Sequence, residues 1–177
     1  MRKIIVPGIA LAAALLAAMP ALAQSKVSQE FIKKAIEGNL SEMRMGKLAQ
    51  QKGASEEIRA YGRELEQDHA AANGKAVPLA QQLGVTAPTE PSKKLREAYN
   101  RISRFSGTKF DREFARYMVK DHKEDIAEYQ REAKRNNDRL AGYVNETLPA
   151  LRKHLERAQA LERQTTAART AAQDGAR

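Results

Sequence analysis

The sequence has no cysteine and no tryptophan, and its 177 residues include only three histidines. Without cysteine, the chain can form no disulfide bond and can carry no lipid on an N-terminal cysteine. Aromatic residues make up 5% of the chain, which leaves few rings on which nucleic-acid bases could stack. No motif for serine, cysteine or phosphate-loop chemistry is present either. The sequence therefore predicts no catalytic residues, and a protein that is not an enzyme is favoured.

Positive charge is in excess but is nowhere concentrated. The formal net charge is +9, yet no run of five like charges occurs, and Lys and Arg are interleaved with Asp and Glu as on solvated helix faces. The excess favours anionic neighbours such as the surface of the cell envelope. Together with the scarcity of aromatic residues, this interleaving predicts no nucleic-acid partner.

A long apolar run occurs only at the N-terminus. Two basic residues, Arg2 and Lys3, precede the charge-free run "IIVPGIALAAALLAAM", and the small residues of "ALA" follow at 21–23. The run of about 16 residues is short for a bilayer span, and its flanks are typical of a secretory signal peptide. We therefore expect 1–23 to be a cleaved signal peptide and the mature protein, which has no transmembrane span, to begin at Gln24. Its location would be periplasmic or secreted; the alternative is an uncleaved membrane anchor.

Apolar residues recur at helical spacing along the rest of the chain, and no stretch alternates with the period of a strand. Breakers and capping residues such as Gly53, Ser55 and Gly84 divide this pattern into segments. Pro78 is expected to kink its helix, and Pro149 either kinks the last helix or marks its start. The segments predict four long helices and one short helix, at about 28–52, 55–83, 92–104, 107–136 and 138–164.

Four long helices with short links predict an all-α, antiparallel four-helix bundle in which a long connection carries the short extra helix. The folded domain is expected to span 28–162. The tail, 163–177, has no large apolar residue and is predicted to be disordered. One core should collect apolar residues that share a helical face, among them Ile58, Leu65, Leu83, Met118, Ile126 and Leu161.

The histidines draw attention because two of them follow an aspartate, as Asp68-His69 in "RELEQDHAAAN" and Asp121-His122 in "YMVKDHKEDIAEY". At 100° per residue, each histidine lies on the apolar stripe of its helix, while the preceding aspartate points about 100° away. His154 lies on the apolar stripe of the last helix in the same way. All three imidazoles are therefore expected to face the interior.

The first long helix has no histidine, but it carries Glu42 in the middle of its apolar stripe. Glu42, His69, His122 and His154 each lie within about three residues of the midpoint of their helix, which is roughly one helical turn. Midpoints share one layer in an antiparallel bundle. Four polar side chains, one from each long helix, are therefore expected to meet in the core.

Three imidazoles and one carboxylate are a plausible ligand set for Zn²⁺, Fe²⁺, Mn²⁺ or Cu²⁺. Glu66, Asp68 and Asp121 are additional candidate ligands. Glu66 and His69 form a single Glu-x-x-His pair, which the other helices do not repeat, so a complete di-iron carboxylate site is not predicted. The alternative is a structural layer, in which each histidine bonds a carboxylate and sets the register of the helices.

Three stretches resemble a known family: "EGNLSEMRMGKLAQQKGASEEIRAYGRELEQDHAAAN", "FDREFARYMVKDHKED" and "LPALRKHLERA". They resemble exported bacterial proteins of unknown function with a ferritin-like fold, which are often labelled as outer membrane proteins. The resemblance covers about residues 28–162 and implies a ferritin-like four-helix bundle and export, but no established activity. The label fits poorly with a chain that lacks a cysteine for a lipid anchor. The resemblance depends on Glu42, Gly46, Asp68, His69, Phe110, Asp111, His122, Leu148, Pro149 and His154.

Two functions stay open. In the first, the protein is an exported periplasmic bundle that binds a transition metal ion through the His/Glu cluster, as a sequestering or sensing protein or as a small oxidase or catalase-like enzyme. In the second, it is a non-catalytic envelope protein, connected with stress, whose histidine layer is structural and whose basic surface contacts anionic envelope polymers.

Overall fold

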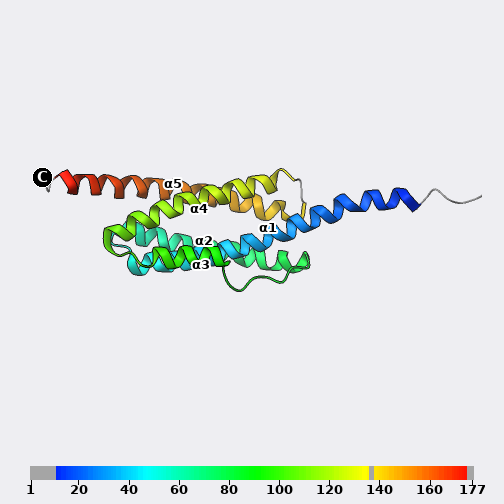
Figure 1. The fold of residues 1–177 in the computed structure, drawn as a ribbon, viewed down its shortest axis with the longest axis horizontal. Helices are drawn as coiled ribbons and strands as arrows, with labels where there is room; N and C mark the ends of the chain where they lie inside the picture. The colour runs from blue at the N-terminus through cyan, green and yellow to red at the C-terminus, as the bar shows by residue number, and fades with distance from the viewer. Residues whose placement is uncertain (1–10, 136–137, 175–177) are drawn as a thin grey trace, which may run out of the picture.

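The computed structural model describes residues 11–135 and 138–174, and within these ranges the chain is helical with no strand. The all-α prediction is confirmed. The described residues form four long helices and one short helix. Figure 1 shows the long helices lying side by side with the short one against them. The long helices are α1 (Leu11–Lys52), α2 (Glu56–Gln82), α4 (Gly107–Ala133) and α5 (Asp138–Asp174). The short helix is α3 (Lys93–Ile102).

The long helices form two antiparallel hairpins. α1 packs mainly against α2, and α4 packs mainly against α5, while contacts of α2 with α5 and of α1 with α4 join the hairpins. The connection after α2 runs back along the molecule and carries α3, so that α4 starts at the same end as α2 and runs in the same direction (Figure 1). Each long helix is therefore antiparallel to both of its main neighbours.

Local chemistry explains the sharp turn between α1 and α2. The Ser55 hydroxyl accepts a hydrogen bond of 3.3 Å from the backbone N–H of Ile58, as expected of an N-cap. The carboxylate of Asp111, on α4, accepts hydrogen bonds from the N–H groups of Ala54 at 2.8 Å and Ser55 at 2.9 Å. The buried Asp111 thus ties the start of α2 to the start of α4. At the other end of α2, Gly84 has a φ of 70°, a conformation that favours glycine.

The first and last helices are longer than predicted. α1 begins at Leu11 rather than near Ser28, because its Ala- and Leu-rich start has high helix propensity, and the helix continues through Pro20. Residues 1–10 of the predicted signal peptide lie outside the described residues, and α1 continues through the predicted cleavage point. α5 continues to Asp174, where a disordered tail was predicted, since its alanine-rich end has high helix propensity.

The polar layer divides the core into two apolar clusters. One contains Met45 and Leu48 of α1, and the other contains Ile32 and Ile36 of the same helix. α2, α4 and α5 likewise contribute residues to both clusters, on either side of their histidine. A single core was predicted, and this prediction is wrong. Ile58, Leu65, Met118 and Leu161 lie in one cluster, whereas Leu83 and the partly buried Ile126 belong to the other.

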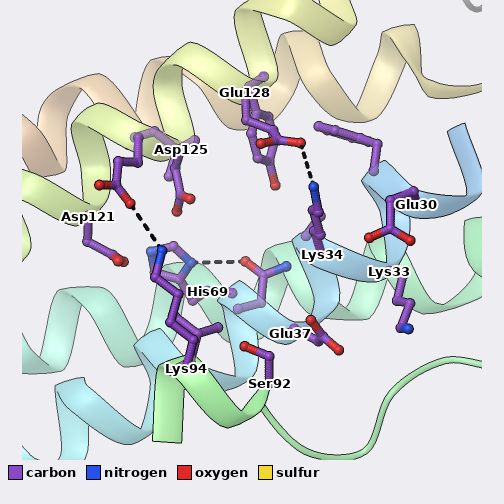
Figure 2. Close-up of a pocket in the computed structure, with 18 residues that line it drawn as sticks. Glu30, Lys33, Lys34, Glu37, His69, Ser92, Lys94, Asp121, Asp125 and Glu128 are labelled. Atoms are coloured by element: carbon purple, nitrogen blue, oxygen red, sulfur yellow. Dashed lines mark hydrogen bonds and ion pairs between the residues drawn. The ribbon is translucent and has the colours of Figure 1, made fainter. Parts of the chain in front are cut away.

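A cavity of about 380 Å³ opens between α1, α3 and α4 and reaches His69 (Figure 2). A smaller cavity, of about 180 Å³, lies between α2 and α5 and is lined by both His69 and His154. His69 therefore lies between the two cavities. Among the described residues, no helix combines the length and the apolarity needed to cross a membrane.

Candidate functional site

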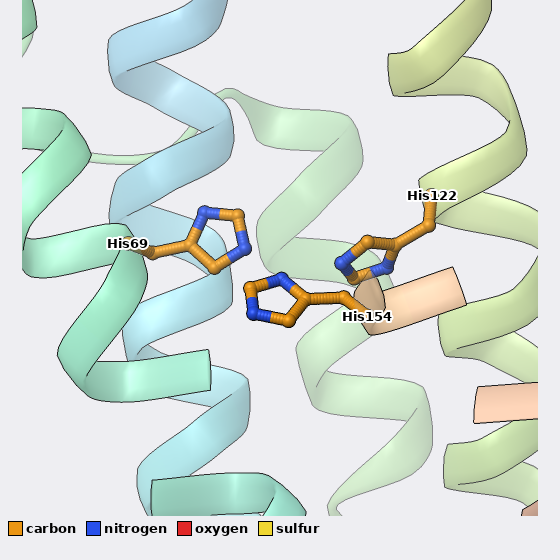
Figure 3. A group of neighbouring side chains, drawn as sticks. All are labelled: His69, His122 and His154. Carbon is orange, nitrogen blue, oxygen red and sulfur yellow. The ribbon is translucent and has the colours of Figure 1, made fainter. Parts of the chain in front are cut away.

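The three histidines converge in the interior, as the sequence predicted. His69, His122 and His154 come from α2, α4 and α5, and their side chains are 3%, 0% and 1% exposed. Their ring centroids are 5.3 to 5.9 Å apart, and one nitrogen of each ring lies within 4.8 Å of one nitrogen of each other ring. Figure 3 shows the three rings turned toward one another from the three helices.

The first imidazole, His69, is oriented by α1. Its Nδ1 lies 2.9 Å from the Oδ1 of Asn39. The amide nitrogen of Asn39 donates to the hydroxyl of Tyr143 at 3.1 Å, which leaves the amide oxygen to face the ring. An amide oxygen can only accept, so the proton of His69 is on Nδ1 and the lone pair is on Nε2.

The other two imidazoles are held in the same manner by different acceptors. Nδ1 of His122 lies 3.0 Å from the carbonyl oxygen of Met118, one turn earlier on α4. Nε2 of His154 lies 2.9 Å from the carboxylate of Asp68 on α2. Each of these nitrogens donates, since a carbonyl oxygen and a carboxylate only accept. The lone pairs are therefore on Nε2 of His122 and on Nδ1 of His154.

The three remaining ring nitrogens are all buried, and no described group donates a hydrogen bond to them. They belong to three rings that face one another, so three lone pairs gather in one small volume. This arrangement has the features of a metal site in which each ligating imidazole gives its other N–H to an acceptor that sets its orientation.

Burial also keeps His69 and His122 neutral. It lowers the pKa of His122 to about 4, and the nearby His154 acts in the same direction. Burial likewise lowers the pKa of His69 well below its ordinary value, with further lowering by His122 and His154. Only a neutral imidazole can bind a metal ion, so protons compete little with a metal at these two residues at neutral pH.

Glu42 completes a buried His/Glu cluster on the α1 side. It is fully buried between the two apolar clusters, and its nearest polar neighbour is the carboxyl group of Asp121, with no described amide or hydroxyl donor at either carboxylate oxygen. Burial raises the pKa of Glu42 well above its ordinary value, and the carboxyl groups of Asp121 and Asp125 raise it further. Glu42 thus faces the acidic side of α4, and the group of ligand atoms within 4.8 Å of one another contains the three histidines without it.

The additional candidates have other partners. Glu66 accepts a hydrogen bond of 2.6 Å from Gln50 and lies 3.5 Å from Lys47, both on α1. Asp68 holds His154 from outside the cluster. Asp121 lines the larger cavity. The sequence thus placed the histidines together correctly, whereas these three carboxylates do not join the group of three imidazoles.

A second group of potential metal ligands consists of Glu64, Asp68 and His154. The candidate ligand atoms of this group also lie within 4.8 Å of one another. Glu64 lies 2.8 Å from Lys153 and 2.6 Å from Arg157, and Asp68 is bonded to His154. Because cations of the protein already neutralise Glu64, this group is an ion-pair network rather than a metal site.

Two residues near the site, Asn39 and Asp125, were not among those predicted from the sequence. Asn39 orients His69 from one turn before Glu42, and an amide on an otherwise apolar stripe was the signal for it. Asp125 lies one turn after Asp121 on α4 and lines the larger cavity. The spacing of four residues places both aspartates on one face.

The comparisons with known proteins identify a family but no activity. The family described as Domain of unknown function (DUF4142) matches residues 13–161, a segment that includes the complete histidine cluster. No curated protein and no solved structure shows a significant match to the chain. The description does not support the outer-membrane label carried by the resemblance, and it leaves the function to be argued from the site. Because the match covers most of its length, the chain belongs to the DUF4142 family.

Proposed function

We propose that this protein binds a transition metal ion through His69, His122 and His154, and that it works as an exported metal-sequestering or metal-sensing protein. The observation that carries the proposal is the group of three buried imidazole nitrogens without a donor, in rings whose other nitrogens are each held by an acceptor.

Free energy favours this function over a purely structural layer. A buried polar atom without a partner costs about 1–3 kcal/mol, and here three such atoms share one volume. Neutral imidazoles that only set the register of the helices would gain if a hydroxyl or amide N–H donated to the second ring nitrogen. A metal ion instead uses all three lone pairs at once.

The ligand chemistry narrows the choice of ion. Neutral imidazole suits Zn²⁺, Cu²⁺ and Fe²⁺, while Mn²⁺ prefers carboxylate and water oxygens and needs Glu42 as a fourth ligand. Three protein ligands leave one position of a tetrahedral ion open. Glu42 or an exogenous ligand could take that position, and an exogenous ligand would make small-molecule chemistry possible.

The proposal also includes a ferritin-like fold and export from the cytoplasm. The direction of α4, set by the long connection that carries α3, supports a ferritin-like bundle with metal ligands on facing helices. The basic start, apolar run and small residues of 1–23 support export. Mass spectrometry of the periplasmic fraction should find a chain beginning at Gln24; an intact chain of 177 residues in the membrane fraction would contradict cleavage after residue 23 and the periplasmic location.

Metal analysis tests the function directly. The protein should be purified from its own periplasm without a histidine tag, and its metal content should approach one ion per chain. Titration of the metal-free protein with Zn²⁺, Cu²⁺, Fe²⁺ and Mn²⁺ should show one tight site. His122→Ala and His154→Ala should each remove that site, because two imidazoles hold an ion far more weakly than three.

Thr147→Val is the matched control. Thr147 is a buried polar residue on α5 whose hydroxyl donates to the carbonyl of Tyr143, outside the cluster. This variant should bind metal as the wild type does. If the wild type binds none of the four ions, the histidine layer is structural and the envelope protein of the alternative becomes the better description.

The Glu42→Gln variant tests whether Glu42 is a ligand of the ion or only lies near the three histidines. If Glu42 coordinates the ion, this variant should bind Mn²⁺ much more weakly than the wild type and Zn²⁺ somewhat more weakly. Equal affinities would leave the three histidines as the complete set of protein ligands.

A further inference from the structure

The larger cavity has a charge opposite to that of the whole chain. The chain is basic, with a net charge of +9, yet the residues that line this cavity include six carboxylates and three lysines. Four of the carboxylates are on α4, at Asp121, Glu124, Asp125 and Glu128. These positions form a single stripe that extends about 10 Å along the helix.

The lysines of the cavity neutralise only part of this stripe. Lys34 lies 3.6 Å from Glu128 and Lys94 lies 3.7 Å from Glu124, and all four side chains are substantially exposed. Figure 2 shows Glu128 at the outer part of the stripe beside Lys34, with Asp125 and Asp121 following along α4 toward His69. The lysines thus form no ion pair with Asp121 or Asp125, the acidic side chains nearer the cluster. Burial and the charge of Asp121 raise the pKa of Asp125 well above its ordinary value.

The inner end of the cavity adjoins the histidine cluster. His69 forms part of the wall, is 3% exposed, and has a buried Nε2 without a donor. Asp121, beside it, faces the buried carboxyl of Glu42. A row of crowded carboxyl groups therefore ends beside a histidine whose Nε2 has no partner, and a divalent cation that replaced their protons would relieve this crowding.

The smaller cavity differs in this respect. Its carboxylates are already engaged, because Asp68 is bonded to His154 and Glu146 lies 2.6 Å from Lys75. Both cavities reach His69, but only the larger one offers carboxylates without a bridging cation.

We propose that the larger cavity is the route by which a divalent metal ion enters and leaves the histidine cluster, with Asp121 and Asp125 as its transient ligands. This inference rests on the proposed metal binding. Carboxylates that bind the ion only in passage lower the barrier in both directions. Their loss should therefore slow binding and release together and leave the equilibrium affinity nearly unchanged.

Stopped-flow absorption with Co²⁺, whose visible spectrum reports its coordination, measures the rates on the metal-free protein. Asp125→Asn should lower the rates of loading and of release by about tenfold or more, since it removes one of the two transient ligands and acidic clefts change association rates by 10-fold to 1000-fold. Added salt should slow loading of the wild type more than that of the variant.

A second variant tests the route without changing a charge. Gly38 lines the cavity, and a Cβ placed on it would have no atom within 4 Å, so a side chain there projects into open space. Gly38→Leu should slow loading by partly filling the cavity. Glu146→Gln is the control in the smaller cavity and should load at the rate of the wild type.

The outcomes separate this inference from the proposed function. If the wild type binds Co²⁺ and both Asp125→Asn and Gly38→Leu load at its rate, the route is wrong and the metal site stands. If Asp125→Asn weakens the affinity without slowing loading, Asp125 is a permanent ligand and the route is also wrong. If Glu146→Gln alone slows loading, the ion enters through the smaller cavity. If the wild type gives no Co²⁺ spectrum, the metal site itself fails.

Discussion

At the scale of single residues, the two Asp-His pairs have different roles although they look alike in the sequence. Asp68 accepts a hydrogen bond from His154 on another helix, while Asp121 faces Glu42 and the larger cavity. Successive side chains on a helix point about 100° apart, so an aspartate cannot easily bond the ring that follows it. The aspartate in each pair therefore interacts with a side chain of a neighbouring helix, His154 for Asp68 and Glu42 for Asp121.

Asn39 is expected to act on the metal site through His69. Asn39→Leu removes the acceptor that sets the ring, and loss of such an outer partner typically lowers metal affinity by about 10-fold to 100-fold. Asn39→Asp keeps an acceptor and should retain most of the affinity. Competition with a chelator of known affinity measures both.

Tyr143→Phe is the control for this prediction. It removes the hydroxyl to which Asn39 donates but leaves the bond between Asn39 and His69 in place. If Tyr143→Phe weakens binding as much as Asn39→Leu does, the effect comes from general loosening of the core and not from the orientation of His69.

The metal-free protein should lose stability in acid because of His122. Its pKa is about 4 in the folded chain and about 6.5 in the unfolded chain, so between these values only the unfolded chain takes up the proton. The stabilisation is fully present above pH 6.5 and is lost as the pH falls toward 4. Between pH 7 and pH 5, this residue alone should lower the free energy of unfolding by about 2 kcal/mol.

A comparison of variants isolates this contribution, since the raised pKa of Glu42 gives an opposite pH dependence. His122→Asn keeps a donor near the Met118 carbonyl but does not titrate. Urea unfolding at pH 7 and pH 5, with a chelator present, should show a smaller loss for the variant by about 2 kcal/mol. Equal losses in the two proteins would mean that folded His122 takes up its proton near pH 6.5.

At the scale of helices, the crossing of α1 and α2 depends on two glycines. A Cβ on Gly62 would lie 2.6 Å from the carbonyl oxygen of Gly46 and 2.8 Å from the Cβ of Ala49. A Cβ on Gly46 would lie 2.5 Å from the carbonyl oxygen of Gly62. Both sets of atoms belong to backbone or to a rigid side chain, so the helices must move apart to accept a larger residue. This close approach carries Glu42 and Asn39 toward the histidines.

Two alanine substitutions in α2 should therefore have opposite effects. Gly62→Ala should destabilise the protein by about 1–3 kcal/mol, because it overpacks the crossing. Gly74→Ala, at an exposed position with no atom near its Cβ, should stabilise it by about 0.5–1 kcal/mol through helix propensity. Thermal melts of the two variants should show a lower Tm for Gly62→Ala and a higher Tm for Gly74→Ala. An unchanged Tm for Gly62→Ala would mean that α1 and α2 are further apart at this crossing.

At the scale of the whole molecule, one polar layer lies between two apolar clusters that are built from the same four long helices. Ligands from α2, α4 and α5 would join both hairpins at this layer, so a bound ion would stabilise the packing of the entire molecule. An ion that binds only the folded chain stabilises it by mass action.

Zn²⁺ at 100 times its Kd should thus raise the free energy of unfolding by about 2.7 kcal/mol. The increase should appear as a higher Tm in a calorimetric scan and should disappear on addition of a chelator. His154→Ala should show no response to Zn²⁺, whereas Thr147→Val should respond as the wild type does. A response of His154→Ala equal to that of the wild type would place the bound Zn²⁺ elsewhere on the protein.

The sequence by itself determined the helical class, the approximate positions of the long helices, and the convergence of the histidines. Period, breakers and capping residues are local properties, and the height and direction of a side chain on a helix follow from its position number. His69, His122 and His154 could therefore be placed in one layer before any contact was known. The start of α1 and the end of α5 were less predictable, because α1 continues through Pro20 and α5 is extended to Asp174 by the helix propensity of its alanine-rich end.

Only the tertiary structure decided which group accepts a hydrogen bond from which imidazole. That Asn39 holds His69, that Asp68 holds His154, and that Glu42 faces Asp121 depend on which helices are neighbours and on how each is rotated about its axis. The division of the core into two clusters and the acidic cavity beside α3 depend on the same choices. Helix pairing is set by side chains far apart in the sequence, whose packing energies no local pattern contains.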